Sequence, residues 1–240
     1  MEYEAEKERI RKRLEEKNVF TEEETIEIVA FLLKTEKLRI PFNELQSIGF
    51  SSEMVDRISA RIWFTEKEIQ FIASMQDDYV KAITVVGRIY AERKDQSGNP
   101  ESRHLCVVSD ALETYEGKVA GFLHDVVEDD YLTLGCLRYI FQFNEKSVCI
   151  VDILTRDKKL YPTYDSYIRE RILPSKILEV QKAKLADMEH NQSPERVKDL
   201  PTEERRYKAS TKYKPYIPLV KSRVEELEEK ELERKRRLTK

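Results

Sequence analysis

The chain has 240 residues, of which 40% are hydrophobic, and this length and apolar content fit one large or two small folded domains. Charged residues make up 37%, but 43 Lys and Arg nearly balance 46 Asp and Glu, so bulk charge does not select nucleic acid or an anionic membrane. No apolar run approaches the roughly 20 residues that span a bilayer, and the N-terminus is charged. We therefore expect a soluble, cytoplasmic protein.

Cysteine and histidine are both scarce. Cys106, Cys136 and Cys149 stand far apart in apolar stretches, without a Cys-x-x-Cys pair, which predicts reduced thiols in the core. Only three His are present, so a hydrolytic metal centre would have to use carboxylates as well.

The N-terminal third predicts a small helical module. Only 6 Gly and apolar residues at helical spacing nearly throughout indicate an all-α fold. Residues 2–17 are rich in Glu, Lys and Arg and predict a solvated helix. Thr21 opens a capping-box pattern before an apolar helix that ends near Lys37, and shorter amphipathic pieces follow. Residues 1–75 contain no pattern of catalytic or metal-binding residues. In the absence of such a pattern we expect a regulatory or dimerising role, which would give a homo-oligomer.

A larger helical region follows. Thr65 repeats the capping-box pattern and opens one long helix to about residue 90, which ends in a polar loop. After a helix from about Arg103, Gly117 is expected to break the chain before a densely apolar, buried helix at 119–127. The remaining helices are expected at 133–141, 145–155, 164–172, 176–190 and 202–228. We expect the main domain to cover 76–222, with a charged helical tail at 223–240.

The sharpest local feature is a polar cluster in that apolar helix: His124-Asp125 followed by Glu128-Asp129. Burying such groups without compensation costs several kcal/mol. A divalent cation held by His124 and Asp125, with Glu128 and Asp129 handling its water, would compensate. The alternative is a core histidine with ordinary hydrogen bonds and carboxylates that cap the helix end.

Two distant residues complete a mixed ligand set. His104 lies at the start of its own helix, and Asp187 ends a Leu-Ala-Asp sequence near the polar end of another. The order His104, His124-Asp125, Asp187 resembles the HD-domain metal phosphohydrolase superfamily. More narrowly, the sequence HDVVED is similar to the hydrolase domain of the RelA/SpoT-type family, which removes the 3′-pyrophosphate from guanosine tetra- and pentaphosphate (ppGpp and pppGpp).

The resemblance covers about residues 78–222, in the order and approximate spacing of the family. It includes Arg93-Lys94 before a polar loop, Ile153-Leu154-Thr155-Arg156, Tyr164-Asp165-Ser166-Tyr167-Ile168 with Arg171, and Arg206-Tyr207-Lys208. Three departures are Leu105, where the family usually has Pro, Arg88, where many members have a further His, and Glu101-Ser102-Arg103, where the family has Pro-Tyr-Ile. The resemblance implies an HD-domain helical bundle in a small stand-alone hydrolase, since nothing resembles the family's synthetase domain.

The resemblance also implies a role for each site residue. The metal ligands would be His104, His124, Asp125 and Asp187, and the family precedent for the metal is Mn²⁺. Glu128 and Asp129 would orient and deprotonate the attacking water. The nucleotide would be contacted by Arg93, Lys94, Asn191 and Tyr207. Alternatives are a solvated helix end for the basic pair and a core aromatic for Tyr207, while His190 is expected beside the site but not among the ligands.

The sequence therefore predicts a metal-dependent 3′-pyrophosphohydrolase that converts ppGpp or pppGpp to GDP or GTP and pyrophosphate. One alternative is another HD nucleotide phosphohydrolase, such as a nucleotidase or an adenosine-alarmone hydrolase. The other is a non-catalytic nucleotide-sensing module. The intact Glu128-Asp129 pair favours an enzyme, because a binding site has no evident need for water-handling acids.

Overall fold

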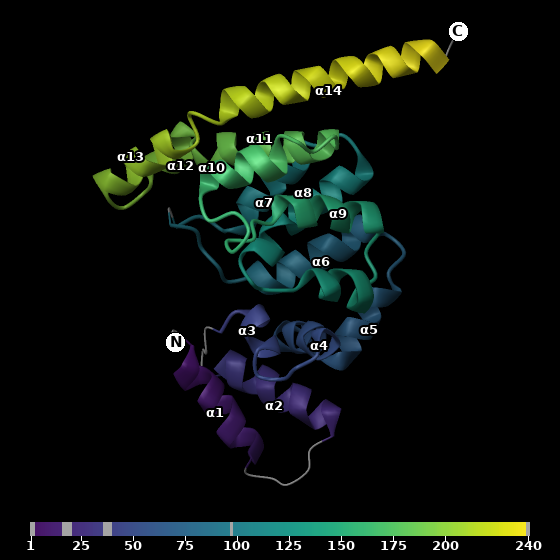
Figure 1. The fold of residues 1–240 in the computed structure, drawn as a ribbon, viewed down its shortest axis with the longest axis vertical. Helices are drawn as coiled ribbons and strands as arrows, with labels where there is room; N and C mark the ends of the chain where they lie inside the picture. The colour runs from purple at the N-terminus through teal and green to yellow at the C-terminus, as the bar shows by residue number, and fades with distance from the viewer. Residues whose placement is uncertain (1–2, 16–20, 36–39, 97, 239–240) are drawn as a thin grey trace. The chain divides into compact units, whose positions relative to one another are not determined.

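The computed structural model describes residues 3–15, 21–35, 40–96 and 98–238. Regular structure in these ranges is helical and includes no strand, only an isolated antiparallel bridge between Lys94 and Pro100, so the all-α prediction is confirmed (Figure 1). The chain divides into two compact units, one of Met1–Val85 with Asp129–Glu145 and the other of Val86–Glu128 with Lys146–Lys240. In this division residues 129–145 belong to the first unit, while the expected domain boundaries at 75 and 222 stay a prediction.

The first unit is built from short helices. Its elements are α1 (Glu4–Glu15), α2 (Glu22–Thr35), α3 (Phe42–Gln46), α4 (Ser52–Trp63), α5 (Glu66–Ser74), most of α6 (Asp78–Tyr90), and the π-helix η1 (Cys136–Ile140). Apolar side chains from α1 to α4 form its core, among them Ile10, Ile26, Val29, Leu45, Val55 and Ile58. The predicted solvated helix is thus seen as α1, but one of its faces is buried through Ile10.

The segment 129–145 joins the first unit through contacts with α4. The indole Nε1 of Trp63 donates to the carbonyl of Tyr131 at 2.9 Å, and the hydroxyl of Thr133 donates to Asp56 at 2.6 Å. The rings of Phe64 and Phe141 lie edge to face nearby. These contacts join residues about 70 positions apart, so a sequence pattern could not show them.

The two capping boxes are confirmed. The backbone N–H of Thr21 donates to Glu24 at 2.9 Å, and the N–H of Glu24 donates to the Thr21 hydroxyl at 3.2 Å. Thr65 and Glu68 make the same reciprocal pair, at 2.7 and 3.3 Å. Each box satisfies two N–H groups that a helix start leaves unpaired.

The single long helix predicted from Thr65 is wrong, because it is two helices. α5 ends at Ser74 and α6 begins at Asp78. The Asp77 carboxylate accepts hydrogen bonds from the N–H groups of Tyr79 and Val80, at 2.9 and 3.2 Å. Asp is a favoured N-cap residue, so this side chain starts a new helix where the apolar spacing alone suggested continuity.

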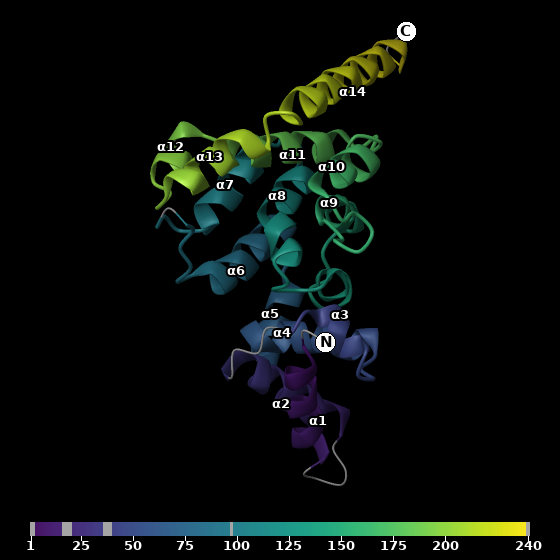
Figure 2. The same cartoon turned by 60° about the vertical axis from the view of Figure 1, so that its left-hand side comes forward.

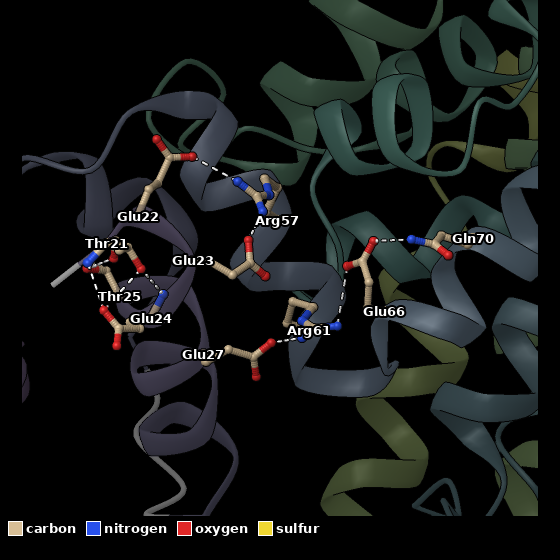
Figure 3. A network of polar contacts seen from close by, with 10 residues as sticks. All are labelled: Thr21, Glu22, Glu23, Glu24, Thr25, Glu27, Arg57, Arg61, Glu66 and Gln70. Atoms are coloured by element: carbon tan, nitrogen blue, oxygen red, sulfur yellow. Dashed lines mark hydrogen bonds and ion pairs between the residues drawn. The ribbon is translucent and has the colours of Figure 1, made fainter.

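Ion pairs join α4 to its neighbours in the first unit (Figure 3). Arg57 pairs with Glu22 of α2 at 2.8 Å, while Arg61 pairs with Glu27 of α2 and, at 3.4 Å, with Glu66 of α5. The carboxylates are exposed, so each pair contributes about 1 kcal/mol or less. Their effect is mainly to orient the helices.

The second unit carries every helix on which a metal ligand was predicted. After the end of α6 its elements are α7 (Ser102–Asp110), α8 (Tyr115–Glu128), α9 (Glu145–Leu154), α10 (Tyr164–Ser166), the π-helix η2 (Tyr167–Ile172), α11 (Leu178–Asn191), α12 (Pro194–Lys198), α13 (Glu203–Lys212) and α14 (Ile217–Leu238). α8 packs against α7, and α11 packs against both and against α14. In both views α11 lies between α14 and the α7–α8 pair (Figures 1 and 2).

The predicted break at Gly117 is wrong, because α8 begins at Tyr115 and continues through it. Gly117 and Gly121 are both buried, and they serve packing. A Cβ atom placed on Gly121 would lie only 2.7 Å from the Cα of Ser109 in α7. Gly121 therefore allows the backbones of α7 and α8 to approach closely, one turn from His124.

The C-terminal region also departs from expectation. Instead of one helix over 202–228, α13 and α14 are separated by a turn that contains Pro215, which lacks the N–H that a continuous helix needs. α14 runs through the expected start of the tail at 223, with Val220, Val224 and Leu227 buried.

The cysteine prediction holds for one residue of three: Cys136 is buried, Cys149 is half-buried and Cys106 is exposed. Cys106 follows Leu105 on α7, whose buried face carries His104, Leu105 and Val108, so its side chain points outward. None of the described helices is both long enough and apolar enough to cross a membrane.

Candidate metal centre

Three packed helices supply the candidate ligands. His104 lies near the start of α7, His124 and Asp125 lie on α8, and Asp187 lies near the end of α11. The His104 and His124 side chains are only 5% and 3% exposed, although imidazoles are costly to bury without partners. The apolar residues around them bury these helices against one another and so carry the polar groups inside.

The four predicted ligands lie together. The Nε2 atom of His104 is 3.5 Å from Asp125 Oδ2 and 3.2 Å from Asp187 Oδ1, and the Nε2 atom of His124 is 3.0 Å from Asp125 Oδ1. Ligand atoms of His104, His124 and Asp125 all lie within 4.8 Å of one another. Asp187 lies beside this group, in contact with His104, but is not part of the set whose atoms are all within 4.8 Å of one another.

Both ring nitrogens of His124 face polar groups. Its Nδ1 lies 2.7 Å from the carbonyl oxygen of Gly121, which can only accept, so Nδ1 carries a proton. Its buried Nε2 has no hydrogen-bond partner, because the nearby Asp125 carboxylate is not aligned for one. Nε2 and the Asp125 carboxylate thus face each other inside the protein, and a cation could replace the proton between them, so the residues present fit a metal site.

Asp187 is held by two donors on its own helix. The Lys184 ammonium donates to Oδ2 at 2.8 Å, and the Asn191 amide donates to Oδ1. Burial raises the pKa of Asp187, but Lys184 and then His104 outweigh burial and hold the pKa well below 3.8. The carboxylate is therefore ionised and fixed in direction. Lys184 was not given a role from the sequence, although its spacing of three from Asp187 on a helix was a usable signal.

Charge interactions in the metal-free cluster favour a proton where a metal would bind. Burial lowers the pKa of His124, but the Asp125 carboxylate more than offsets it and raises the pKa to about 9. Burial raises the pKa of Asp125, and His124 overcomes this and lowers it. Binding of a cation therefore requires His124 to give up its proton.

Glu128 and Asp129 differ in their surroundings. Glu128 is the last residue of α8, one helical turn from the His124-Asp125 pair, and it is half-buried. Burial raises the pKa of Glu128, partly opposed by the nearby Lys184 charge. Asp129 is exposed and begins the segment that belongs to the first unit. The role of Asp129 stays a prediction.

Of the residues predicted to contact the substrate, one lies at the metal centre. Asn191 is at the centre through its bond to Asp187. Arg93 is half-buried, with its Nε donating to the carbonyl of Ile89 at 3.1 Å, and Lys94 is exposed. The ring of Tyr207 on α13 is 71% exposed, so it is not a core aromatic. Contact of these last three residues with a nucleotide stays a prediction.

A group of lysines and tyrosines near Asp187 was not found from the sequence. The Lys184 ammonium lies 5.2 Å from the centre of the Tyr167 ring, and the Lys212 ammonium lies 4.9 and 4.7 Å from the rings of Tyr164 and Tyr213. The Tyr164 hydroxyl is buried without a hydrogen-bond partner. Burial and then Lys184 lower the pKa of Lys212. Four separate elements bring these residues together, so no local pattern marks them.

Comparison with models of known protein families finds none that matches the chain, and comparison with curated proteins finds no relative.

Proposed function

We propose that this chain is a metal-dependent phosphohydrolase that removes the 3′-pyrophosphate from ppGpp and pppGpp. The observation that carries the proposal is the buried cluster of His104, His124 and Asp125, whose possible ligand atoms all lie within 4.8 Å of one another. The substrate comes from the sequence resemblance alone.

The ligand set suits a divalent cation of hard or borderline character, such as Mn²⁺. Such a cation, when bound, polarises a phosphoryl oxygen and lowers the pKa of a water molecule. The chain would hold it through Nε2 of His104 and His124 and through the carboxylates of Asp125 and Asp187. Lys184 keeps the Asp187 carboxylate ionised, so this side chain can bind a cation at neutral pH.

Glu128 is the proposed proton acceptor. Its carboxylate lies on the same helix as His124 and Asp125, one turn further along, and burial raises its pKa towards the range where a general base works well. It would take a proton from the attacking water as the new bond between oxygen and phosphorus forms. The bond between phosphorus and the 3′ oxygen breaks, that oxygen takes a proton from solvent, and pyrophosphate and the nucleoside 5′-di- or triphosphate separate, while Glu128 returns its proton to solvent. Asp129 would orient the water.

Basic and aromatic side chains would bind the polyanionic substrate. Arg93, Lys94 and Tyr207 are proposed to contact the nucleotide, and Asn191 to brace the site through Asp187. The Lys212 ammonium, held between two tyrosine rings, adds positive charge near Asp187. A chain whose net charge is only −3 can thus present local positive charge to phosphates.

The test is hydrolysis of ppGpp by the purified chain with Mn²⁺, measured as pyrophosphate and GDP released. A panel of pppGpp, the adenosine analogue of ppGpp, and ordinary nucleoside triphosphates, scored by product, distinguishes the two enzyme alternatives. No turnover of any member, with Mn²⁺, Co²⁺ or Zn²⁺, would contradict a catalytic function.

Two variants separate metal binding from proton transfer. Asp125→Asn should abolish Mn²⁺ binding, because a neutral amide replaces the charged ligand. Glu128→Gln should bind Mn²⁺ as the wild type does but lose about 10²–10⁴-fold in kcat, the usual contribution of a general base. Calorimetry with Mn²⁺ and initial rates measure both effects. Equal loss of helical circular dichroism in both variants would instead favour a structural role for the cluster.

A further inference from the structure

The third histidine of the chain contacts a candidate ligand. His190 lies in the last turn of α11, three residues after Asp187. Its Nδ1 is 2.7 Å from the Nδ1 of His104, and the two ring planes are inclined by only 17°, with ring centres 5.0 Å apart. Two imidazole nitrogens at this separation form a hydrogen bond only when one carries the proton and the other a lone pair.

Arg196 determines which nitrogen carries the proton. Its Nη1 lies 3.3 Å from the same Nδ1 of His190, and a guanidinium can only donate. The Nδ1 of His190 is therefore an acceptor, so the Nδ1 of His104 must be the donor. This assignment holds whether His104 is neutral or charged, because its Nδ1 keeps a proton in both forms.

The proton on Nδ1 leaves Nε2 of His104 as the atom directed at the centre, where Asp125 and Asp187 lie 3.5 and 3.2 Å away. His124 is arranged in the same way, since its Nδ1 donates to the carbonyl of Gly121. Metal-binding histidines commonly donate their other ring N–H to a carbonyl, carboxylate or water, which fixes the tautomer and the ring direction. His190 occupies that position for His104.

We propose that His190 is a positioning residue for the metal centre, whose Nδ1 accepts the proton of His104 Nδ1 and so directs His104 Nε2 towards the cation. Arg196 fixes the His190 tautomer by donating to the same nitrogen. The role rests on the proposed metal-dependent function, but it adds a residue outside the ligand set. A neutral acceptor orients the ligand without adding another negative charge to a centre that already has two carboxylates.

Two substitutions at one position test the role by Mn²⁺ affinity of the full chain. His190→Leu removes the acceptor, and His190→Gln keeps a carbonyl oxygen that can accept from His104. We expect His190→Leu to weaken Mn²⁺ binding about 10–100-fold, the usual effect of losing such a partner, and His190→Gln to weaken it by less than about threefold. Glu189→Gln, at the exposed neighbouring residue, is the control and should bind as the wild type does.

The outcome that overturns the role is His190→Leu binding Mn²⁺ within twofold of the wild type. Equal weakening by Leu and Gln also overturns it, because a merely structural role would not distinguish an acceptor from an apolar side chain.

Nitrogen-15 NMR of the wild-type histidines, metal-free and with diamagnetic Zn²⁺, tests the proton assignment without any substitution. Nδ1 should be protonated in His104 and bare in His190 in both states. A protonated Nδ1 in His190 overturns the inference even where the cation binds. Failure of the wild type to bind any cation would instead overturn the proposed function, so the two failures are distinguishable.

Discussion

Gly121→Ala should separate the two helices that carry His104 and His124. The new Cβ would lie 2.7 Å from Ser109 Cα and 2.9 Å from Ser109 N, both backbone atoms of α7, whereas ordinary contact begins at 3.4 Å. The α7 backbone must therefore move by about 0.7 Å to restore ordinary contact. Overpacking of this kind costs about 1–3 kcal/mol. Alanine also gains about 1 kcal/mol over glycine in a helix, which hides part of the loss.

Gly87→Ala is the matched control. Gly87 lies in α6 and is exposed, and a Cβ placed on it meets no atom within 4 Å. It should gain the helix preference alone, so the unfolding free energies of the two variants should differ by about 1–3 kcal/mol, the cost of the clash. Urea unfolding followed by circular dichroism measures this difference. Equal stability of the two variants would refute the close approach of α7 and α8.

The same substitution should weaken the metal centre. Ligand distances in metal sites are held to about ±0.2 Å, and a 0.7 Å movement of α7 relative to α8 exceeds this tolerance. Mn²⁺ affinity of Gly121→Ala should therefore fall by at least about tenfold, while Gly87→Ala should bind as the wild type does. Unchanged affinity, together with the expected loss of stability, would show that the α7–α8 spacing does not set the ligand geometry.

Two further predictions concern the buried charge pair and the thiols. Lys184→Met should lower the unfolding free energy by about 3–5 kcal/mol, because it leaves Asp187 charged and buried without its partner. Adding Asp187→Asn should recover part of this loss, as measured by urea unfolding. No recovery would mean that the broken ion pair is not the cause of the loss. Cys106 should react with a thiol reagent in the folded chain, but more slowly than a free thiol, because partial burial raises its pKa. Cys136 should react only after denaturation. Mass spectrometry of the labelled chain identifies the sites, and labelling of Cys136 in the folded chain would contradict its burial.

Local signals predicted the helix starts well. Thr21 and Thr65 each stand three residues before a Glu, and both capping boxes form because the interaction needs only neighbouring residues. The same kind of signal at Asp77 was overlooked, since the apolar spacing continues across it, and the long helix divides there. The prediction at Gly117 failed for another reason: glycine often marks a break, but here it stands in the tightly packed first turn of α8.

At the candidate site, too, local sequence patterns could not predict contacts between residues far apart in the chain. The four candidate ligands were chosen because the resemblance gives their order, and the structure places them on three packed helices. The contact of His190 with His104 joins positions 86 residues apart, and the grouping of Lys212 with Tyr164 depends on how α13 packs. Periodicity describes which face of a helix is buried, but not which helix it meets.

The packing of α14 has a practical consequence for experiments that shorten or tag the chain. α11, which carries Asp187, is covered by α14 through buried Val220, Val224 and Leu227, with an ion pair from Lys182 to Glu228 at 2.7 Å. Removing residues after about 230 should leave this cover in place. Removing all of α14 would expose the outer face of α11 to water, so loss of metal binding in that shortened chain would report on a missing support and not on a missing ligand.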